Sequence, residues 1–389
     1  MFKQYVNNEQ FNLQINRFIN DYYQEDDRAG ADLEIIIPKL IDTHSWYEAW
    51  LDFAKKREDS KDYDLASVYY QAAEFYLAPI DPNKEKMYHK YRETFYKGFH
   101  DFDYESYKIP YEDSYLPAVK LMTPGAKKTL LVFGGYDSYM EELLKMMKFM
   151  KGIDYNIIVF DGPGQGTALK NGLKFIHNWE KPISTVIDYF KLDRVSLIGA
   201  SWGGYLAMRA AAFEKRIDKV VAFNIFYCGL DALKMGMPEE TYQSMMQLVD
   251  HNEVDQVNSL LEKMMTHNID LHWKITKGME NTGESTPFGL IKNFEKHTMQ
   301  GIGAFINQDV LLLAGEDDQY VPISRLPQIQ QELINAASIT TKVFTKETGG
   351  EQHCQAGHRE LAFNEIKNSY NNCKYIFFIR NMPIKIVVP

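Results

Sequence analysis

The feature that most constrains this chain is a sharp turn around Ser201. An apolar run, Val195 to Ile198, has the composition of a buried strand, and Tyr205 to Ala212 has that of a helix. Only Gly-Ala-Ser-Trp-Gly (199–203) and one more glycine separate the two. Such a turn strains the backbone of its central residue, and neighbouring glycines leave the space that it needs. The pattern predicts a serine hydroxyl at a helix N-terminus, where N–H groups favour developing negative charge.

Two interpretations of Ser201 are open from the motif alone. A G-x-S-x-G sequence occurs often by chance, and in a tight strand-to-helix turn the serine can be purely structural. The strand before it, the helix after it and the adjacent Gly204 favour a nucleophile, because together they hold the hydroxyl at the tip of the turn.

The composition limits the classes of protein to which the chain can belong. With 389 residues, 45% of them hydrophobic and 25% charged, it is typical of a globular protein of two or three domains. A net charge of -10 argues against nucleic acid or an anionic membrane as the main partner. Three cysteines without metal-like spacing favour a cytoplasmic location and no bound metal. We expect no signal peptide and no membrane insertion, because no apolar run approaches the ~20 residues that span a bilayer.

Hydrophobic periodicity divides the chain into segments. Residues 1–103 have apolar side chains at helical spacing, which predicts an N-terminal helical cap domain. Residues 104–226 and 306–389 contain apolar runs separated by helical stretches, which predicts a mostly parallel central sheet flanked by helices. Alternation on both sides of Glu112–Ser114 predicts an antiparallel pair at the sheet edge. The apolar run that follows Cys373 has no functional explanation.

Residues 227–305 interrupt the sheet pattern with several helical stretches and hold 8 of the 17 methionines. Methionine is flexible and polarizable, which suits a lid over apolar ligands. We therefore expect a helical lid insertion, and a plainly packed helical excursion is the alternative that the sequence leaves open.

A serine nucleophile needs a base, and the base needs a carboxylate to orient it. In the fold that this turn is typical of, both follow the serine along the chain. The acid candidate is Asp318, on the loop after an apolar strand, in a sequence that matches G-x-x-D-x-x-V-P. Its neighbours Glu316 and Asp317, and Asp231 on the loop after the preceding strand, are the alternatives. In the structural interpretation these acids form a solvated turn.

The base candidate is His353, which follows the last sheet strand and precedes the last helix. Gly349 and Gly350 allow its loop to fold back toward the serine. His358 lies five residues further on, where the helix should begin. The other histidines lack this context.

A tetrahedral intermediate needs hydrogen-bond donors for its oxyanion. One donor should be the backbone N–H of Trp202, directly after the nucleophile. The second should come from Gly-Gly-Tyr-Asp-Ser (134–138), after the strand that ends at Phe133, and we expect Gly135 or Tyr136 to donate it.

Together these motifs resemble the α/β-hydrolase superfamily. The resemblance rests on Gly134 to Ser138 with Glu141 and Glu142, Asp161 to Gly166, Gly199 to Gly204, and Glu351 to Gly357. The pattern of Trp46, Trp50 and Ala72 to Tyr76 in the first domain is also similar. The chain is similar to the branch with a helical N-terminal domain, which includes 2,6-dihydroxypseudooxynicotine hydrolase, fungal polyketide-shortening hydrolases and FrsA-like esterases. Proteins of this kind are also often labelled as similar to acylaminoacyl peptidases. The likeness covers about residues 40–370 and implies a triad of Ser201, Asp318 and His353 that needs no cofactor.

The resemblance implies acyl-enzyme chemistry on an ester or an amide, or, in some members, on a C–C bond beside a carbonyl. Members of the last kind carry an additional acidic residue near the oxyanion loop, and Asp137 is the matching position. Capping the following helix is the structural alternative for Asp137.

Our leading hypothesis is a serine hydrolase that acts on a small apolar or aromatic acyl compound or a short peptide. An esterase, an acylaminoacyl-peptidase-like exopeptidase and a C–C hydrolase are the options within this class. A non-catalytic hydrolase-fold protein that binds a ligand or a partner is the alternative from another class. The oligomeric state is left open, with a homodimer as one option.

Overall fold

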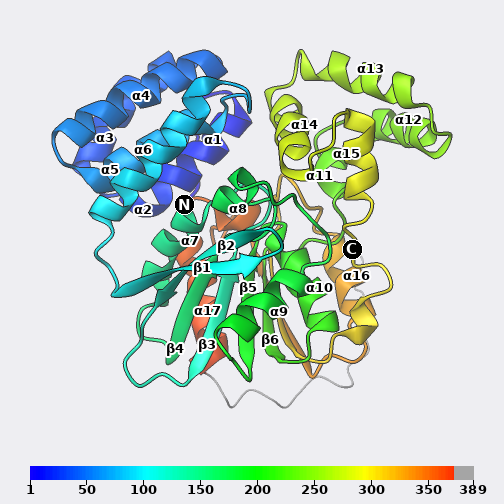
Figure 1. The fold of residues 1–389 in the computed structure, drawn as a ribbon. Helices are drawn as coiled ribbons and strands as arrows, with labels where there is room; N and C mark the ends of the chain where they lie inside the picture. Colours follow the sequence, from blue (N-terminus) through cyan, green and yellow to red (C-terminus); the bar gives the residue numbers. More distant parts are fainter. Residues whose placement is uncertain (372–389) are drawn as a thin grey trace.

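The computed structural model describes residues 1–371, so the apolar run after Cys373 lies outside the described residues. One group of helices precedes the first strand of a central sheet, and another lies between its sixth and seventh strands (Figure 1). The eight strands are β1 (Tyr104–Tyr111), β2 (Ser114–Leu121), β3 (Lys128–Phe133), β4 (Tyr155–Phe160), β5 (Val195–Ala200), β6 (Ile217–Phe223), β7 (Asp309–Gly315) and β8 (Ser338–Phe344).

The sheet has the strand order β1-β2-β4-β3-β5-β6-β7-β8. Strands β3 to β8 pair in parallel, whereas β1 and β2 form an antiparallel pair that joins β4 at one edge. The predicted α/β fold with a mostly parallel sheet and an antiparallel edge is confirmed. Since β5 lies between β3 and β6, the loops after those two strands flank the turn that contains Ser201.

Successive side chains of each strand belong to two different cores. Leu131 and Leu197 face the core that includes α9, α10, α16 and the helices between β6 and β7. Leu130 and Ile198 face the core that includes α7, α17 and the N-terminal helices. Both faces are covered, which explains the continuous apolar runs in the sequence. The helices that flank the sheet are α7 (Met140–Met146), α8 (Gly166–Lys170), α9 (Glu180–Tyr189), α10 (Gly203–Phe213), α16 (Arg325–Glu332) and α17 (Arg359–Asn371).

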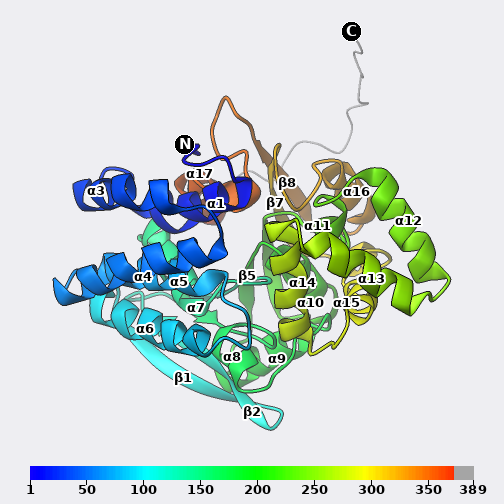
Figure 2. The same ribbon diagram turned by 90° about the horizontal axis from the view of Figure 1, so that it is seen from above.

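Two further helical groups lie at the same end of the sheet, one beside the other (Figures 1 and 2). The N-terminal group consists of α1 (Glu9–Ile15), the π-helical η1 (Asn16–Asn20), α2 (Asp21–Tyr23), α3 (Asp27–Ile36), α4 (Thr43–Asp59), α5 (Tyr63–Phe75) and α6 (Pro82–Gly98). The group between β6 and β7 consists of α11 (Asp231–Lys234), α12 (Glu239–Asp250), α13 (Val254–Met265), α14 (Ile269–Thr282) and α15 (Pro287–Phe294). The division into domains at residues 103, 226 and 305 stays a prediction.

Helix ends depart slightly from the sequence pattern. The apolar periodicity after the strand β7 indicates a helix from residue 323, yet α16 begins at Arg325. The N–H groups of Arg325 and Leu326 donate to the carbonyl oxygens of Pro322 and Ile323, three residues earlier, so tighter turns precede the α-helix. No helix within residues 1–371 has both the length and the apolar character needed to cross a bilayer.

Candidate active site

Ser201 lies at the tip of the turn between β5 and α10, with a φ of 60°. This left-handed conformation is strained for a residue with a side chain and persists only where the surroundings enforce it. A Cβ on Gly199 would lie 1.9 Å from the carbonyl oxygen of Gly203, and a Cβ on Gly204 would lie 2.1 Å from that of Asn224. The motif needs these glycines because backbone atoms occupy the space that a side chain would take.

The structure brings Ser201, His353 and Asp318 together. Ser201 Oγ lies 2.7 Å from His353 Nε2, and His353 Nδ1 lies 2.8 Å from Asp318 Oδ2 and 2.9 Å from Oδ1. Both side chains of the acid–histidine pair are almost fully buried. A hydroxyl, an imidazole and a carboxylate in this order can transfer the hydroxyl proton to the ring.

The Asp318 carboxylate is fixed by three further donors. Its Oδ1 accepts hydrogen bonds from the backbone N–H groups of Tyr320 (2.8 Å) and Val321 (2.9 Å). Its Oδ2 accepts one from Asn224 Nδ2 at 2.5 Å. These donors prevent the carboxylate from turning away from the ring.

The charge of Asp318 and the burial of the ring shift the pKa of His353 in opposite directions. Burial disfavours the imidazolium, but the carboxylate of Asp318 outweighs that effect and raises the pKa of His353 above its ordinary value. The acid therefore stabilises the charged ring that forms when His353 accepts a proton.

The other candidates for these roles have different partners. Asp231 forms an ion pair with Arg325 at 2.6 Å, and Asp317 pairs with Lys346 at 2.5 Å. Glu316 accepts a hydrogen bond from the N–H of Lys346, and the ring of His358 contacts neither Ser201 nor Asp318. Gly349 and Gly350 adopt φ angles of 78° and 80°, which only glycine reaches without strain.

The loop after β3 lies directly against the turn. A Cβ on Gly135 would be 2.6 Å from the backbone nitrogen of Trp202. Within residues 1–371, neither the N–H of Trp202 nor the N–H groups of Gly135 and Tyr136 donate a hydrogen bond to the protein. These donors are therefore free to bind an oxygen atom of a ligand.

Side chains from two distant segments hold this loop. Gln165 Nε2 donates to the carbonyl oxygens of Gly134 (2.7 Å) and Gly135 (2.9 Å), and Asn281 Nδ2 donates to that of Tyr136 (2.6 Å). In a trans peptide the N–H points away from the C=O of the same unit. Fixing these carbonyls therefore also fixes the direction of the N–H groups of Gly135 and Tyr136.

The ring of Trp202 is fixed on the other side of the turn. It stacks on Tyr136 with a centroid distance of 5.4 Å, and its Nε1 donates to Nδ1 of His297 at 3.1 Å. Burial lowers the pKa of His297 well below its ordinary value, so the ring is neutral and can accept this hydrogen bond.

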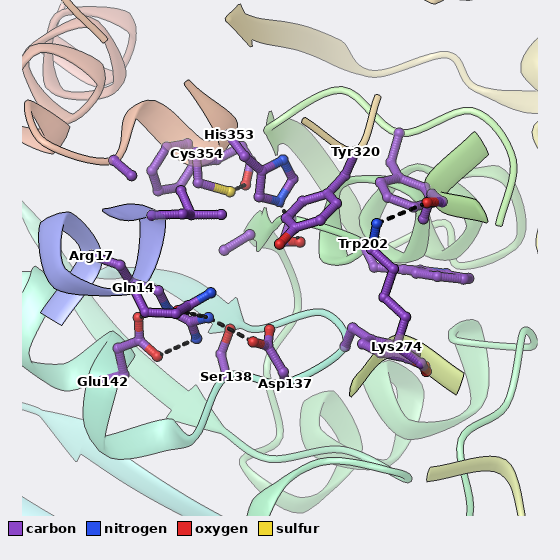
Figure 3. A pocket seen from close by; sticks show the side chains of 18 of the residues that line it. Gln14, Arg17, Asp137, Ser138, Glu142, Trp202, Lys274, Tyr320, His353 and Cys354 are labelled. Atoms are coloured by element: carbon purple, nitrogen blue, oxygen red, sulfur yellow. Dashed lines mark hydrogen bonds and ion pairs between the residues drawn. The ribbon is translucent and has the colours of Figure 1, made fainter. Parts of the chain in front are cut away.

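A pocket opens at Ser201 and His353 and holds about 820 Å³ of space between atoms, part of it open to solvent. One wall is apolar, with Phe226, Leu233 and Phe294 among its residues. A second part of the lining, the polar wall, carries polar side chains of the N-terminal segment and of the β3–α7 region. Figure 3 shows the labelled side chains of this pocket, including Gln14, Arg17, Asp137, Ser138, Glu142, Lys274 and Tyr320.

Arg17 connects the N-terminal helices to the polar wall. It bonds to both oxygens of Glu142 at 2.7 and 2.8 Å and to one oxygen of Asp137 at 2.6 Å (Figure 3). The helix α7 has Tyr139 as its N-cap, without a side-chain hydrogen bond, so Asp137 does not cap it. Asp137 instead lines the pocket with its second oxygen free of protein donors within residues 1–371.

Comparison with known proteins identifies the family to which the chain belongs. Residues 133–355, more than half of the chain, match the family described as the alpha/beta hydrolase fold. The chain belongs to the α/β-hydrolase fold family. The curated relatives of this hydrolase include 20-hydroxy-prefusarin hydrolase FUS2 of Gibberella moniliformis, which is 28% identical over 299 residues that cover 67% of this chain and 70% of the relative. Hydrolase LUC6 of a Fusarium species is also 28% identical, over 72% of this chain and 75% of the relative.

Two solved structures resemble the hydrolase over nearly its whole length. The structure of 2,6-dihydroxy-pseudo-oxynicotine hydrolase has a TM-score of 0.67 and 18% identity, and covers 91% of this chain and 95% of its own. AbyA5 has a TM-score of 0.69 and 15% identity, and covers 94% of this chain and 95% of its own. At these identities the likeness supports the fold, and the relatives named hydrolases support the enzyme class.

Sequence reasoning missed several residues of the hydrolase site. Asn224 follows β6 directly, but an amide after a strand is common, and only its contact with Asp318 indicates a role. Gln165 lies in a loop that the sequence indicates only as a structural turn, and Asn281 lies in the insertion. For Arg17 the sequence offered no signal, because its partners are more than 100 residues away.

No group of three or more His, Cys, Asp or Glu side chains in the described part of the hydrolase is arranged to hold a metal ion. The carboxylates that line the pocket are paired with Arg17.

Proposed function

We propose that this enzyme is a serine hydrolase that cleaves an ester or an amide of a small apolar or aromatic acyl compound through an acyl-enzyme. The observation that carries the proposal is the contact of 2.7 Å between Ser201 Oγ and His353 Nε2, with Asp318 on the far side of the ring. The same arrangement of groups supports acyl transfer on unrelated folds, because the roles depend on geometry.

In the proposed reaction Ser201 Oγ attacks the substrate carbonyl carbon while His353 Nε2 accepts the hydroxyl proton. The new C–O bond forms as the electrons of the C=O bond move to the oxygen. The intermediate then collapses, the bond to the leaving group breaks, and His353 returns the proton to that group. Water repeats the sequence on the acyl-enzyme and releases the acid.

The oxyanion of the intermediate binds to the N–H of Trp202 and to the N–H of Gly135 or Tyr136. The free state of these donors and the fixed carbonyls of their loop support this assignment. Preorganised donors of this kind contribute about 10²–10³ to the rate each, because they need no reorganisation as the charge develops.

The pocket supports a small, partly apolar substrate. Phe226, Leu233 and Phe294 offer an apolar surface to an acyl group, whereas Asp137 offers a hydrogen-bond acceptor to a polar substituent. The similar protein from Gibberella moniliformis is named after a small organic molecule, 20-hydroxy-prefusarin, which also favours a small-molecule substrate.

Cleavage of a C–C bond beside a carbonyl is a second candidate, which the position of Asp137 favours. This carboxylate lines the pocket next to the proposed oxyanion donors, is held by Arg17 and does not cap α7. In such a reaction Asp137 acts as an auxiliary acid or base for the carbon leaving group.

A turnover panel of p-nitrophenyl esters, aminoacyl anilides and β-diketones tests the proposal and identifies the bond. We expect Ser201→Ala and His353→Ala to lower kcat on the best substrate by about a million-fold. His358→Ala, which changes the other histidine of the same loop, should leave it unchanged. Turnover by Ser201→Ala at the native rate would contradict the assignment of Ser201 as the nucleophile. Cleavage of long-chain lipid esters alone would contradict the proposal of a small substrate.

A further inference from the structure

A second cavity lies beside the pocket that contains Ser201, in the seam between α5 and α14. This outer groove holds about 880 Å³ of space between atoms, with Leu77, Lys84, His272 and Lys277 among its residues. Trp273 on α14 lines both the outer groove and the inner pocket. Within residues 1–371, Trp273 is the residue that the two linings share.

The Trp273 side chain packs against aromatic rings and makes no hydrogen bond within residues 1–371. It stacks on Phe75, the last residue of α5, with a centroid distance of 4.9 Å and an interplanar angle of 21°. It meets Tyr136 of the oxyanion loop edge-on at 6.1 Å. The side chain makes no hydrogen bond within residues 1–371, so its displacement would leave no buried donor or acceptor without a partner.

Next to this seam, polar contacts join α14 to the N-terminal helix α1. Gln10 Nε2, on α1, donates to Asp270 Oδ1 at 2.5 Å and to the hydroxyl of Tyr320 at 2.6 Å. Asp270 also pairs with Lys274 at 2.6 Å. Opening the seam there would break the two hydrogen bonds of Gln10, whereas opening it at Trp273 separates only aromatic faces.

The two cavities differ in character. The inner pocket presents the apolar wall of Phe226 and Phe294 next to Ser201. The outer groove carries the ion pair of Lys277 with Glu280 at 2.8 Å and the exposed rings of His267 and His272. A substrate that reached from one to the other would place an apolar part inside and a polar end outside.

We propose that Trp273 is a specificity-determining residue that closes the inner pocket toward the outer groove and so limits the length of the substrate. This inference rests on the proposed reaction at Ser201. The substrates that match the native enzyme have an acyl part that ends at the Trp273 ring, and a longer chain must displace the ring to enter the groove.

A chain-length series of p-nitrophenyl esters tests the proposal in the full-length protein. For the native enzyme kcat/KM should rise with each added methylene and then fall when the chain reaches Trp273. Trp273→Ala should move that optimum to longer chains, and beyond the native optimum its kcat/KM should rise about fourfold for each methylene that becomes buried. An unchanged optimum in a folded, active Trp273→Ala enzyme would overturn the proposal.

Two further variants distinguish a boundary from a general loss of packing. Trp273→Phe retains an aromatic ring and should keep the optimum within one or two methylenes of the native value. His272→Ala changes the neighbouring residue of α14, which lines only the outer groove, and should leave the optimum unchanged. A shift in His272→Ala equal to that in Trp273→Ala would contradict a specific role of the ring.

A second measurement does not depend on turnover. The thiol of Cys354 lines the inner pocket and is nearly buried, so its reaction rate reports access to that pocket. In a background with Cys228 and Cys373 replaced by serine, Trp273→Ala should increase the rate with a long-chain alkyl maleimide, because the reagent gains access. Equal rates would refute the role of Trp273, even if the native enzyme cleaved no ester and the proposed reaction failed.

Discussion

At the scale of single residues, the site depends on how strictly each group is held. Ser201 is fixed by a strained backbone, His353 by the serine and the acid, and Asp318 by Asn224 and two backbone donors. Each proposed catalytic group thus has at least one partner that fixes its direction, which is what transfer of a proton in the transition state requires.

The charge of Asp318 should be visible in the pH dependence of the reaction. Asp318→Asn removes the carboxylate that raises the pKa of His353, so the ring will lose its proton at lower pH. We expect the acid limb of kcat/KM against pH to move to lower pH, and kcat to fall about 10⁴-fold because the ring is no longer oriented. Steady-state rates across the pH range measure both effects.

Asp317→Asn is the matched control for this experiment. Asp317 is the adjacent carboxylate, but it pairs with Lys346 on the surface. The replacement of Asp317 should leave the acid limb of kcat/KM against pH at its native position. An acid limb that stayed in place in Asp318→Asn would contradict the contact between the acid and the ring.

From the sequence, Ser201, Asp318 and His353 are predicted as a triad because each lies at a characteristic place, after a strand and before a helix, and the structure brings their side chains into contact. The sequence left Asp318 uncertain against Asp317, Glu316 and Asp231, since the spacing of acids in a loop does not reveal which one faces inward. Asn224 could not be selected, because an amide after a strand is common and only its contact with the acid gives it a role.

At the scale of elements, the N-terminal helices contribute directly to the pocket. The helices α1 and η1 supply Leu13, Gln14 and Arg17 to its wall, although they lie more than 100 residues before β5, the strand that precedes Ser201. Arg17 carries this connection through a largely buried ion pair with Glu142 and Asp137.

Removing the cation of this cluster should destabilise the enzyme. Arg17→Ala leaves two largely buried carboxylates with one fewer positive charge, and we expect the free energy of unfolding to fall by about 3 kcal/mol. Lys56→Ala serves as the control, because Lys56 pairs with Asp52 in solvent and should change the stability by less than about 0.5 kcal/mol. Urea titrations give both values, and a loss below about 1 kcal/mol in Arg17→Ala would contradict the account.

Periodicity predicted the strands of the sheet well, because a strand buried on both faces leaves an uninterrupted apolar run. Helix ends were harder, as at α16, where tighter turns precede the first α-helical turn. The π-helical turn at η1, which carries Arg17, has no signature in the sequence.

At the scale of the whole molecule, the two helical groups complete different cores of one sheet. The N-terminal helices share a core with α7 and α17, whereas the insertion shares one with α9, α10 and α16. We propose that residues 1–103 and 227–305 are structural units that nevertheless depend on the sheet. The sequence indicated the segments from their periodicity but could not indicate which face each would cover.

This arrangement predicts a single cooperative unfolding transition. Separation of either helical group would expose apolar side chains of the core that it shares with the sheet, so we expect all units to unfold together. Differential scanning calorimetry should give a calorimetric enthalpy equal to the van't Hoff enthalpy. Two resolved transitions would instead mean that a helical group unfolds independently of the sheet.

The account as a whole depends on Ser201 being an activated nucleophile, and reaction with a fluorophosphonate probe measures this directly. We predict that the native protein forms one covalent adduct, that peptide mapping assigns it to Ser201, and that Ser201→Ala forms none. Ser138→Ala, which changes another serine of the same pocket, should react at the native rate. A native protein that stays unlabelled, or an adduct that persists in Ser201→Ala, would contradict the assignment of the active site.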